Sequence, residues 1–197
     1  MAIITDKSGR EPAGLAGQPQ AQGLYDPRHE HDSCGVGFVV NVKGQRSHAI
    51  VRQALEVLIN LIHRGACGCE PNTGDGAGLL LQLPDKFLRR ETAALGFDLP
   101  KAGEYGVGML FLPQQANERA RIEEQVSRIT AEEGLSVLGW RTVPTDNSPL
   151  GATAKQAEPL IRQVFIGRTG NVGEQQDSQA QFERKLYVIR MRLTRAV

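Results

Sequence analysis

The chain has 197 residues, of which 40% are hydrophobic and 23% charged, a composition typical of one soluble globular domain with a substantial core. Its 23 basic and 22 acidic side chains are interspersed and sum to a formal net charge of +1, which argues against nucleic acid or an anionic membrane as partner. No apolar run is long enough to span a bilayer, and the N-terminus lacks the pattern of a secretory signal. The three cysteines do not make a disulfide framework, which favours a reducing, cytoplasmic location.

The N-terminal segment, residues 1–33, differs in composition from the remainder. It is rich in Gly, Pro, Gln and Ala and contains few residues that form a core, so we interpret it as a leader that precedes the folded domain. Cys34 follows directly, and residues 36–42 after it are β-branched and aromatic, which predicts a buried strand. The predicted folded domain therefore spans residues 34–197.

Helices and strands are predicted in turn along this domain. The spacing of apolar residues predicts amphipathic helices at 49–62, from 84 to about 96, at about 115–133 and around 182–193. Short apolar runs predict strands at 79–83, 105–112, 135–143 and 159–167. This order indicates a mixed domain of helices and strands, with helices packed on sheet faces.

The long loop at residues 63–78 contains five glycines and one proline, which exclude regular structure over most of it. A loop of this length within a compact domain is usually functional. Arg64 offers a planar guanidinium suited to a carboxylate, and Asn72, Thr73 and Asp75 add polar groups between glycines. The alternative is structural, since His63 and Arg64 would also suit the negative end of the preceding helix.

Cys34 is the candidate nucleophile. If the leader is removed, the thiol and a free α-amine belong to the same residue. The two groups titrate near about 8.5 and about 8, so the amine can accept the thiol proton without a separate histidine. The alternative is that Cys34 is a small buried residue at the start of a strand.

Two other kinds of site fit the sequence less well. The potential metal ligands do not follow the spacing of a structural zinc site, because Cys67 and Cys69 are separated by one residue and no second pair follows. These potential ligands are His29, His31, Cys34, His63, Cys67 and Cys69. The glycines of the loop are not followed by Gly-Lys-Ser/Thr, so they do not form a phosphate-binding loop. We therefore expect neither a metal nor a phosphate in this chain.

Four segments resemble the N-terminal part of the glutamate synthase large chain, in order and over nearly the whole sequence. They are LYDPRHEHDSCGVGF (24–38), NLIHRGA (60–66), NTGDGAG (72–78) and FERKLYVIR (182–190). The resemblance implies an α+β class II glutamine amidotransferase domain with the αββα sandwich of the N-terminal nucleophile hydrolases. It further implies that Cys34 is the mature first residue and catalytic nucleophile, and that Arg64 and Gly65 line the site beside it.

The implied function is glutamine hydrolysis to glutamate and ammonia, which supplies the reductive amination of 2-oxoglutarate in glutamate biosynthesis and nitrogen assimilation. The family's chains are several times longer, and their oxyanion-hole Asn-Gly pair and substrate-binding Asp lie beyond the position of Val197. We therefore expect the sandwich to be incomplete at the C-terminus and this chain to be inactive alone.

The resemblance also implies what lies outside this chain. FMN and an iron-sulfur cluster are expected in other domains of the synthase, and no cofactor is expected in residues 1–197. The expected partners are glutamine, those domains and a reductase subunit. Two alternatives remain: a non-catalytic remnant of the fold that serves as an interaction domain, or a different class II amidotransferase.

Overall fold

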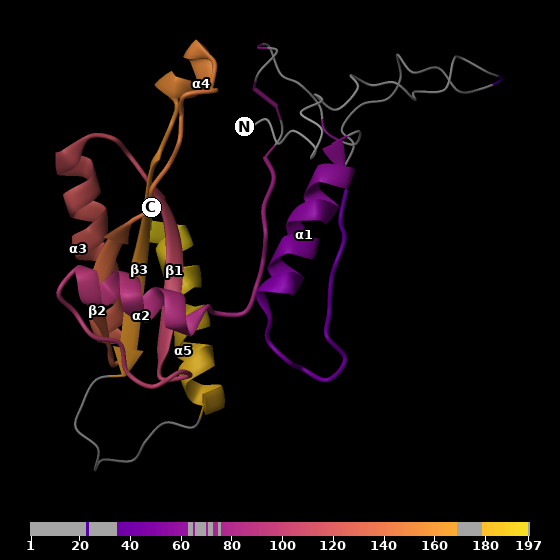
Figure 1. Ribbon diagram of the computed structural model, residues 1–197. Coiled ribbons are helices and arrows are strands. Elements are labelled where there is room, and N and C mark those ends of the chain that lie inside the picture. Colours follow the sequence, from indigo (N-terminus) through magenta and orange to yellow (C-terminus); the bar gives the residue numbers. More distant parts are fainter. Residues whose placement is uncertain are drawn as a thin grey trace. The chain divides into compact units, whose positions relative to one another are not determined.

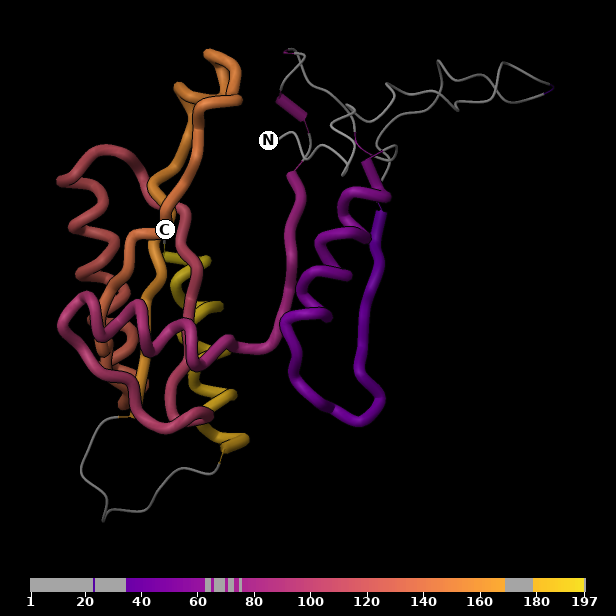
Figure 2. Tube along the Cα trace, viewed as in Figure 1, coloured from indigo at the N-terminus to yellow at the C-terminus, as the bar shows by residue number. Residues whose placement is uncertain are grey.

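The computed structural model describes residues 23, 35–62, 65, 70, 73, 74, 76–168 and 179–196. These residues form two compact units (Figures 1 and 2). Unit 1 comprises the described residues up to Gln82 together with Asp146–Ala157, and unit 2 comprises Leu83–Thr145 and the described residues from Glu158 onward.

Unit 2 is built on a three-stranded antiparallel sheet with strand order β1-β3-β2. The strands are β1 (Tyr105–Leu112), β2 (Leu135–Thr142) and β3 (Leu160–Arg168). All three strands were predicted from their apolar runs, and the boundaries agree to within a residue. The order places the last strand in the centre, where both of its edges are paired.

Helices cover both faces of this sheet (Figure 1). One core joins β3 to α3 (Ala116–Glu132) and α5 (Gln179–Ala196) through the buried Val164 and Ile166. The other joins β3 to α2 (Asp85–Ala94) through Phe165. Because successive strand residues point to opposite faces, the central strand contributes to both cores.

The amphipathic helices predicted at about 115–133 and around 182–193 are α3 and α5, and part of the apolar face of each is buried. Val126 and Ile129 of α3 are buried, as are Phe182 and Ile189 of α5. α2 ends at Ala94 and is followed by Gly96, whose φ of +84° favours glycine, and the N–H of Phe97 donates to the carbonyl of Thr92 (3.1 Å). The predicted end of this helix near Gly96 is therefore correct.

Unit 1 contains two helices, α1 (His48–Asn60) and α4 (Ala152–Gln156). The first was predicted, and the second was missed because it has only five residues within a segment rich in Pro and Gly. Asn41 forms a turn before α1, in which the N–H of Gly44 donates to the Asn41 carbonyl (2.9 Å).

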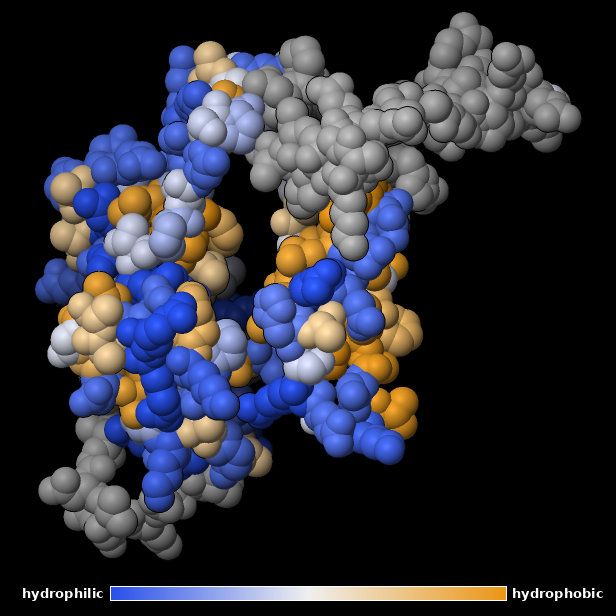
Figure 3. All heavy atoms as spheres, viewed as in Figure 1, coloured by the Kyte–Doolittle hydropathy of each residue, from blue (hydrophilic) through white to orange (hydrophobic). Residues whose placement is uncertain are grey.

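Two predicted strands of unit 1 are wrong in this structure. Residues 35–41 and 76–84 have neither helix nor paired strand, and the side chains expected to be buried are largely exposed. Val36 and Phe38 are each 88% exposed, Val42 is 97% exposed and Leu80 is fully exposed. Figure 3 shows the apolar surface over α1 and the segments beside it. A strand needs a hydrogen-bonded neighbour, and alternation of side chains does not supply one.

The described residues thus form a mixed α+β structure with one small antiparallel sheet. A sandwich of two sheets, the finer expectation, is not seen in them. None of the described helices is long and apolar enough to cross a membrane.

Candidate active site

The C-terminal end of α1 leads into the predicted site loop. Leu61 caps the helix, and its N–H donates to the carbonyls of Val57 (3.1 Å) and Leu58 (3.3 Å). The next described residue of the loop is Gly65, which is exposed and whose N–H donates to the carbonyl of Ile62 (3.1 Å). This hydrogen bond connects the residue after the Leu61 cap to the predicted site loop.

Two glycines after Cys34 lie against this same helix. A Cβ atom added to Gly35 would lie 2.8 Å from Cδ2 of Leu61, and one added to Gly37 would lie 2.4 Å from Cγ1 of Val57. These positions allow the backbone to approach α1 only because they lack a side chain. The groups that approach these two glycines are the side chains of Leu61 and Val57.

Cys34 and Arg64 themselves lie outside the described residues, as do His63, Cys67, Cys69, Asn72 and Asp75. The structure places one neighbour of each: Gly35 follows Cys34, and Gly65 follows Arg64. Gly35 contacts Leu61, three residues before Arg64. The two predicted site residues are thus attached to segments that meet at the end of α1.

A second cluster in unit 1 joins the loop to the segment that carries α4. The Glu70 carboxylate accepts hydrogen bonds from the backbone N–H of Thr153 to Oε1 (2.9 Å) and from the Thr73 hydroxyl to Oε2 (3.1 Å). The Thr73 hydroxyl in turn accepts from the backbone N–H of Gly151 (3.2 Å). We call these four residues, Glu70, Thr73, Gly151 and Thr153, the loop clasp.

The loop clasp affects the charge and the packing of its members. Hydrogen bonds, above all the one from the Thr153 backbone, lower the pKa of Glu70 from its usual value of 4.5 despite the opposing effect of desolvation. A Cβ atom on Gly151 would lie 2.0 Å from Oε2 of Glu70, so only glycine leaves room for the carboxylate. Glu70 therefore remains ionised in neutral solution.

Sequence reasoning identified Thr73 as a polar loop residue but did not identify Glu70. Its partners at 151 and 153 are about eighty positions away in the sequence, and no local pattern indicates such a pairing. The Gly151-Ala152 start of α4 is a weak signal, because the backbone N–H groups at the start of a helix can donate hydrogen bonds to a carboxylate.

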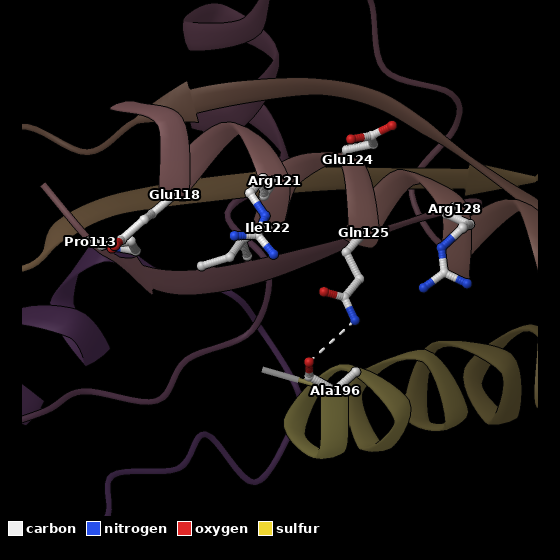
Figure 4. A pocket seen from close by; sticks show the side chains of 8 residues that line it. All are labelled: Pro113, Glu118, Arg121, Ile122, Glu124, Gln125, Arg128 and Ala196. Atoms are coloured by element: carbon white, nitrogen blue, oxygen red, sulfur yellow. Dashed lines mark hydrogen bonds between the residues drawn. The ribbon is translucent and has the colours of Figure 1, made fainter. Parts of the chain in front are cut away.

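A pocket of about 630 Å³ lies on unit 2, between α3 and the end of α5 (Figure 4). It is lined by Pro113, Glu118, Arg121, Ile122, Glu124, Gln125, Arg128 and Ala196. The Gln125 side chain crosses it to donate to the Ala196 carbonyl (3.3 Å). The lining contains no nucleophile, and acidic and basic side chains alternate along α3, so this pocket is not the candidate active site. Within the described ranges, no three His, Cys, Asp or Glu side chains gather as metal ligands.

Comparison with known proteins gives the family. A model of the family "Glutamine amidotransferases class-II" matches residues 34–197, beginning at Cys34. The chain is 48% identical over 172 residues to the "Glutamate synthase [NADPH] large chain" of Bacillus subtilis, covering 87% of this chain and 11% of that protein. It is 42% identical over 180 residues to "Glutamate synthase [NADH]" of Schizosaccharomyces pombe, covering 91% of this chain and 8% of that one.

The chain is also similar to a plant glutamate synthase, whose name specifies ferredoxin as the electron donor. The chain is 36% identical over 197 residues to "Ferredoxin-dependent glutamate synthase 1, chloroplastic/mitochondrial" of Arabidopsis thaliana, covering 98% of this chain and 12% of that protein. The chain thus spans about a tenth of the length of these relatives. Since the family match covers most of the sequence, the chain belongs to the class II glutamine amidotransferases and is homologous to a part of the glutamate synthases.

Proposed function

We propose that this chain supplies the glutamine-hydrolysing part of a glutamate synthase, with Cys34 as the N-terminal nucleophile after removal of residues 1–33. The observation that carries the proposal is the family match, which begins at Cys34 and continues to residue 197. The change in composition at the same position supports it, because residues 1–33 lack the apolar residues of a core.

The proposed reaction uses the two functional groups of one residue. The α-amine accepts the thiol proton, and the thiolate attacks the side-chain amide carbon of glutamine to give a tetrahedral intermediate. The C–N bond then breaks, the amine returns its proton to the leaving nitrogen, and ammonia departs from a thioester. Water attacks the thioester and releases glutamate and the free thiol. Arg64 and Gly65 are proposed to line the substrate pocket, since a guanidinium pairs well with a carboxylate.

The geometry at the end of α1 supports this pairing of residues. Gly35, the residue after Cys34 in the sequence, packs against Leu61, which is four residues before Gly65 in the sequence. A larger residue at position 35 or 37 would push the segment away from the helix.

We also propose that the complete domain is an αββα sandwich, in which a second sheet covers the apolar side chains of residues 36–40. Val36, Phe38 and Val40 alternate along the sequence before the turn at Asn41 and are all exposed. Such a row of apolar side chains is stabilised when another layer covers it.

The wider protein is part of the proposal. Ammonia released at Cys34 would be consumed at a second site where 2-oxoglutarate is aminated and reduced, with FMN and an iron-sulfur cluster bound by other domains. A reductase subunit and a cytoplasmic location are proposed on the same basis. The named relatives use NADPH, NADH or ferredoxin, so the similarity is compatible with any of these donors.

The proposal is tested by replacing Cys34 with alanine in the complete polypeptide that contains this sequence. Glutamine-dependent glutamate formation should fall to background while ammonia-dependent formation continues, because only the source of ammonia is lost. Cys69→Ala serves as a matched control and should retain both activities. Continued turnover of glutamine by the Cys34→Ala variant would refute the assignment, and inertness of the unaltered polypeptide towards glutamine would favour a non-catalytic domain.

A further inference from the structure

We propose that the edge of β1 that faces away from β3, which we call the free edge, is the docking site for a β-strand that directly follows α5 in the complete polypeptide. This strand would extend unit 2 to a four-stranded antiparallel sheet. The present chain spans about a tenth of the length of the named relatives, and a polypeptide of their length has residues to supply the strand. The inference does not depend on glutamine hydrolysis, because it rests on the backbone of unit 2.

The register of the sheet identifies the backbone groups at the free edge. The N–H of Val143 donates to the carbonyl of Ile161 (2.9 Å), so the backbone of Ile161 faces β2. Since successive strand residues direct their backbone groups to opposite neighbours, Arg162 faces β1, and its partner Leu110 faces β3. The same alternation directs the other set of β1 backbone groups to the free edge, those of Tyr105, Val107, Met109 and Phe111. Among the residues that the structure describes, no strand pairs with this edge.

The sequence of β1 does not protect the free edge from pairing. It reads YGVGMLFL, without charge or proline, and its register with β3 is uninterrupted. Met109 and Phe111 are 52% and 67% exposed. The strand at the opposite edge, β2, has an irregular register between Val137 and Gly139 and contains Arg141. Because bulges, charges and proline are the usual means of blocking an edge, β1 has the features of an inner strand and β2 those of an edge strand.

The helices indicate that the next strand lies beside β1. The connection from β1 through α3 to β2 joins two parallel strands and passes over β3. The central strand runs in the opposite direction, and α5 packs with α3 in one core and so on the same face of the sheet. Connections of this kind are right-handed, so a strand that follows α5 and runs parallel to β3 lies on the far side of β1. The resulting order, β-α-β-β-α-β, is that of the split β-α-β motif.

The position of α5 agrees with this direction. Its Leu186 packs on β1, since a Cβ atom added to Gly106 would lie 2.6 Å from Cδ1 of Leu186. At the C-terminal end of the helix, Ala196 lines the same pocket as Pro113, the residue after β1 (Figure 4). The residues that follow α5 therefore start near the end of β1, which is where an antiparallel partner of β1 begins.

Hydrogen exchange, measured residue by residue in the 197-residue chain and in the complete polypeptide, tests the pairing. The amides of Val107, Met109 and Phe111 should exchange at least about tenfold more slowly in the complete polypeptide, because they gain hydrogen-bonded neighbours. The amides of Gly108 and Leu110 bond to β3 and should be slow in both proteins, as an internal control. Equal exchange at the free edge in the two proteins would overturn the inference. Slow exchange that appears in the 197-residue chain as its concentration rises would assign the edge to a second copy and would overturn it as well.

Photo-crosslinking in the complete polypeptide identifies the occupant of the free edge. With p-benzoylphenylalanine in place of Phe111, the cross-link should fall within about 30 residues after Val197, the length of a short connection and a strand. The matched control places the same group at Phe87, which is 39% exposed and lies beside Arg141 of β2, at the opposite edge of the sheet. The control should not cross-link to that segment. Attachment from position 111 to another region, or to a second copy, would contradict the inference, whether or not the polypeptide hydrolyses glutamine.

Discussion

Tyr105 is a polar residue in the core of unit 2, and its buried hydroxyl has a hydrogen-bond partner. It is 3% exposed, and its hydroxyl donates to Oδ1 of Asp85 (2.9 Å). Arg89 pairs with the other oxygen of Asp85 (3.0 Å) and donates to the carbonyls of Leu99 (2.7 Å) and Pro100. These bonds fix the start of α2 to the connection that leads into β1.

Burial and the neighbouring Asp85 carboxylate raise the pKa of Tyr105 to about 12. Because the pKa of Tyr105 is higher in the folded state than in the unfolded state, the neutral hydroxyl contributes its full stabilisation below pH 10, the usual pKa of tyrosine. This stabilisation is lost as the pH rises towards 12. Tyr105→Phe should lower the free energy of unfolding at pH 7 by about 1–2 kcal/mol and should remove much of this alkaline dependence. Urea titrations of the chain between pH 7 and pH 11 check both effects, and an unchanged alkaline slope in the variant would contradict them.

Glycines show how far residue-level reasoning from sequence extends. Gly35 and Gly37 leave room for a close approach because they lack a side chain, and the groups that approach them are Leu61 and Val57. Gly139 was not singled out, although an added Cβ would lie 2.7 Å from the Phe97 ring, because nothing local to the sequence around Gly139 indicates that Phe97 packs there. The same limitation applies to Glu70, whose partners are distant in sequence.

At the scale of elements, apolar packing and ion pairs both join α3 to α5. Phe182 is fully buried in the core between these helices and the sheet. On the surface, Arg192 pairs with Glu133 (2.7 Å) and with Glu132, and its side chain remains 38% exposed. The burial of apolar area should dominate, because exposed ion pairs are screened by solvent.

Two variants compare the contribution of apolar burial with that of the exposed ion pairs. Phe182→Ala should reduce the free energy of unfolding by about 3–5 kcal/mol. Arg192→Ala should reduce it by less than about 1 kcal/mol, and that smaller loss should shrink further in high salt. Urea unfolding of both variants at low and high ionic strength makes the measurement. A larger cost for Arg192→Ala than for Phe182→Ala would mean that the ion pairs hold the two helices together.

The elements of unit 2 were predictable and those of unit 1 only partly so, for a physical reason. The strands at 105–112, 135–143 and 159–167 pair with one another, so the alternating pattern and the partners occur in the same unit. Residues 36–42 carry a similar pattern, but none of the described residues pairs with them as a strand. Sequence periodicity specifies which side of a strand is apolar, whereas pairing depends on the tertiary partner.

At the scale of the whole molecule, the exposed apolar side chains of Val36, Phe38 and Val40 in unit 1 provide a test of the proposed second sheet. Phe38→Ser should change the stability of the 197-residue chain by less than about 0.5 kcal/mol, because the side chain is 88% exposed. In the complete polypeptide the same change should cost about 3 kcal/mol if a second sheet covers it. Thermal unfolding of both proteins tests this, and an equally small effect in both would contradict the proposed second sheet.

The functional assignment also belongs to this scale, because it depends on the whole 34–197 match rather than on one motif. The sequence alone suggested the family, Cys34, Arg64 and Gly65. The structure adds two observations: Gly35 and Gly65 both lie at the end of α1, and the loop clasp joins Glu70 and Thr73 to the segment that carries α4. Neither could be predicted, since both depend on contacts between separate segments.

The most direct measurement is mass spectrometry of the complete polypeptide after treatment with an electrophile that mimics glutamine. The account predicts a mature chain that begins at residue 34 and carries a single covalent adduct on that cysteine, with glutamine protecting against the modification. A protein that hydrolyses glutamine while residues 1–33 remain attached, or one labelled at Cys67 or Cys69 instead, would contradict it.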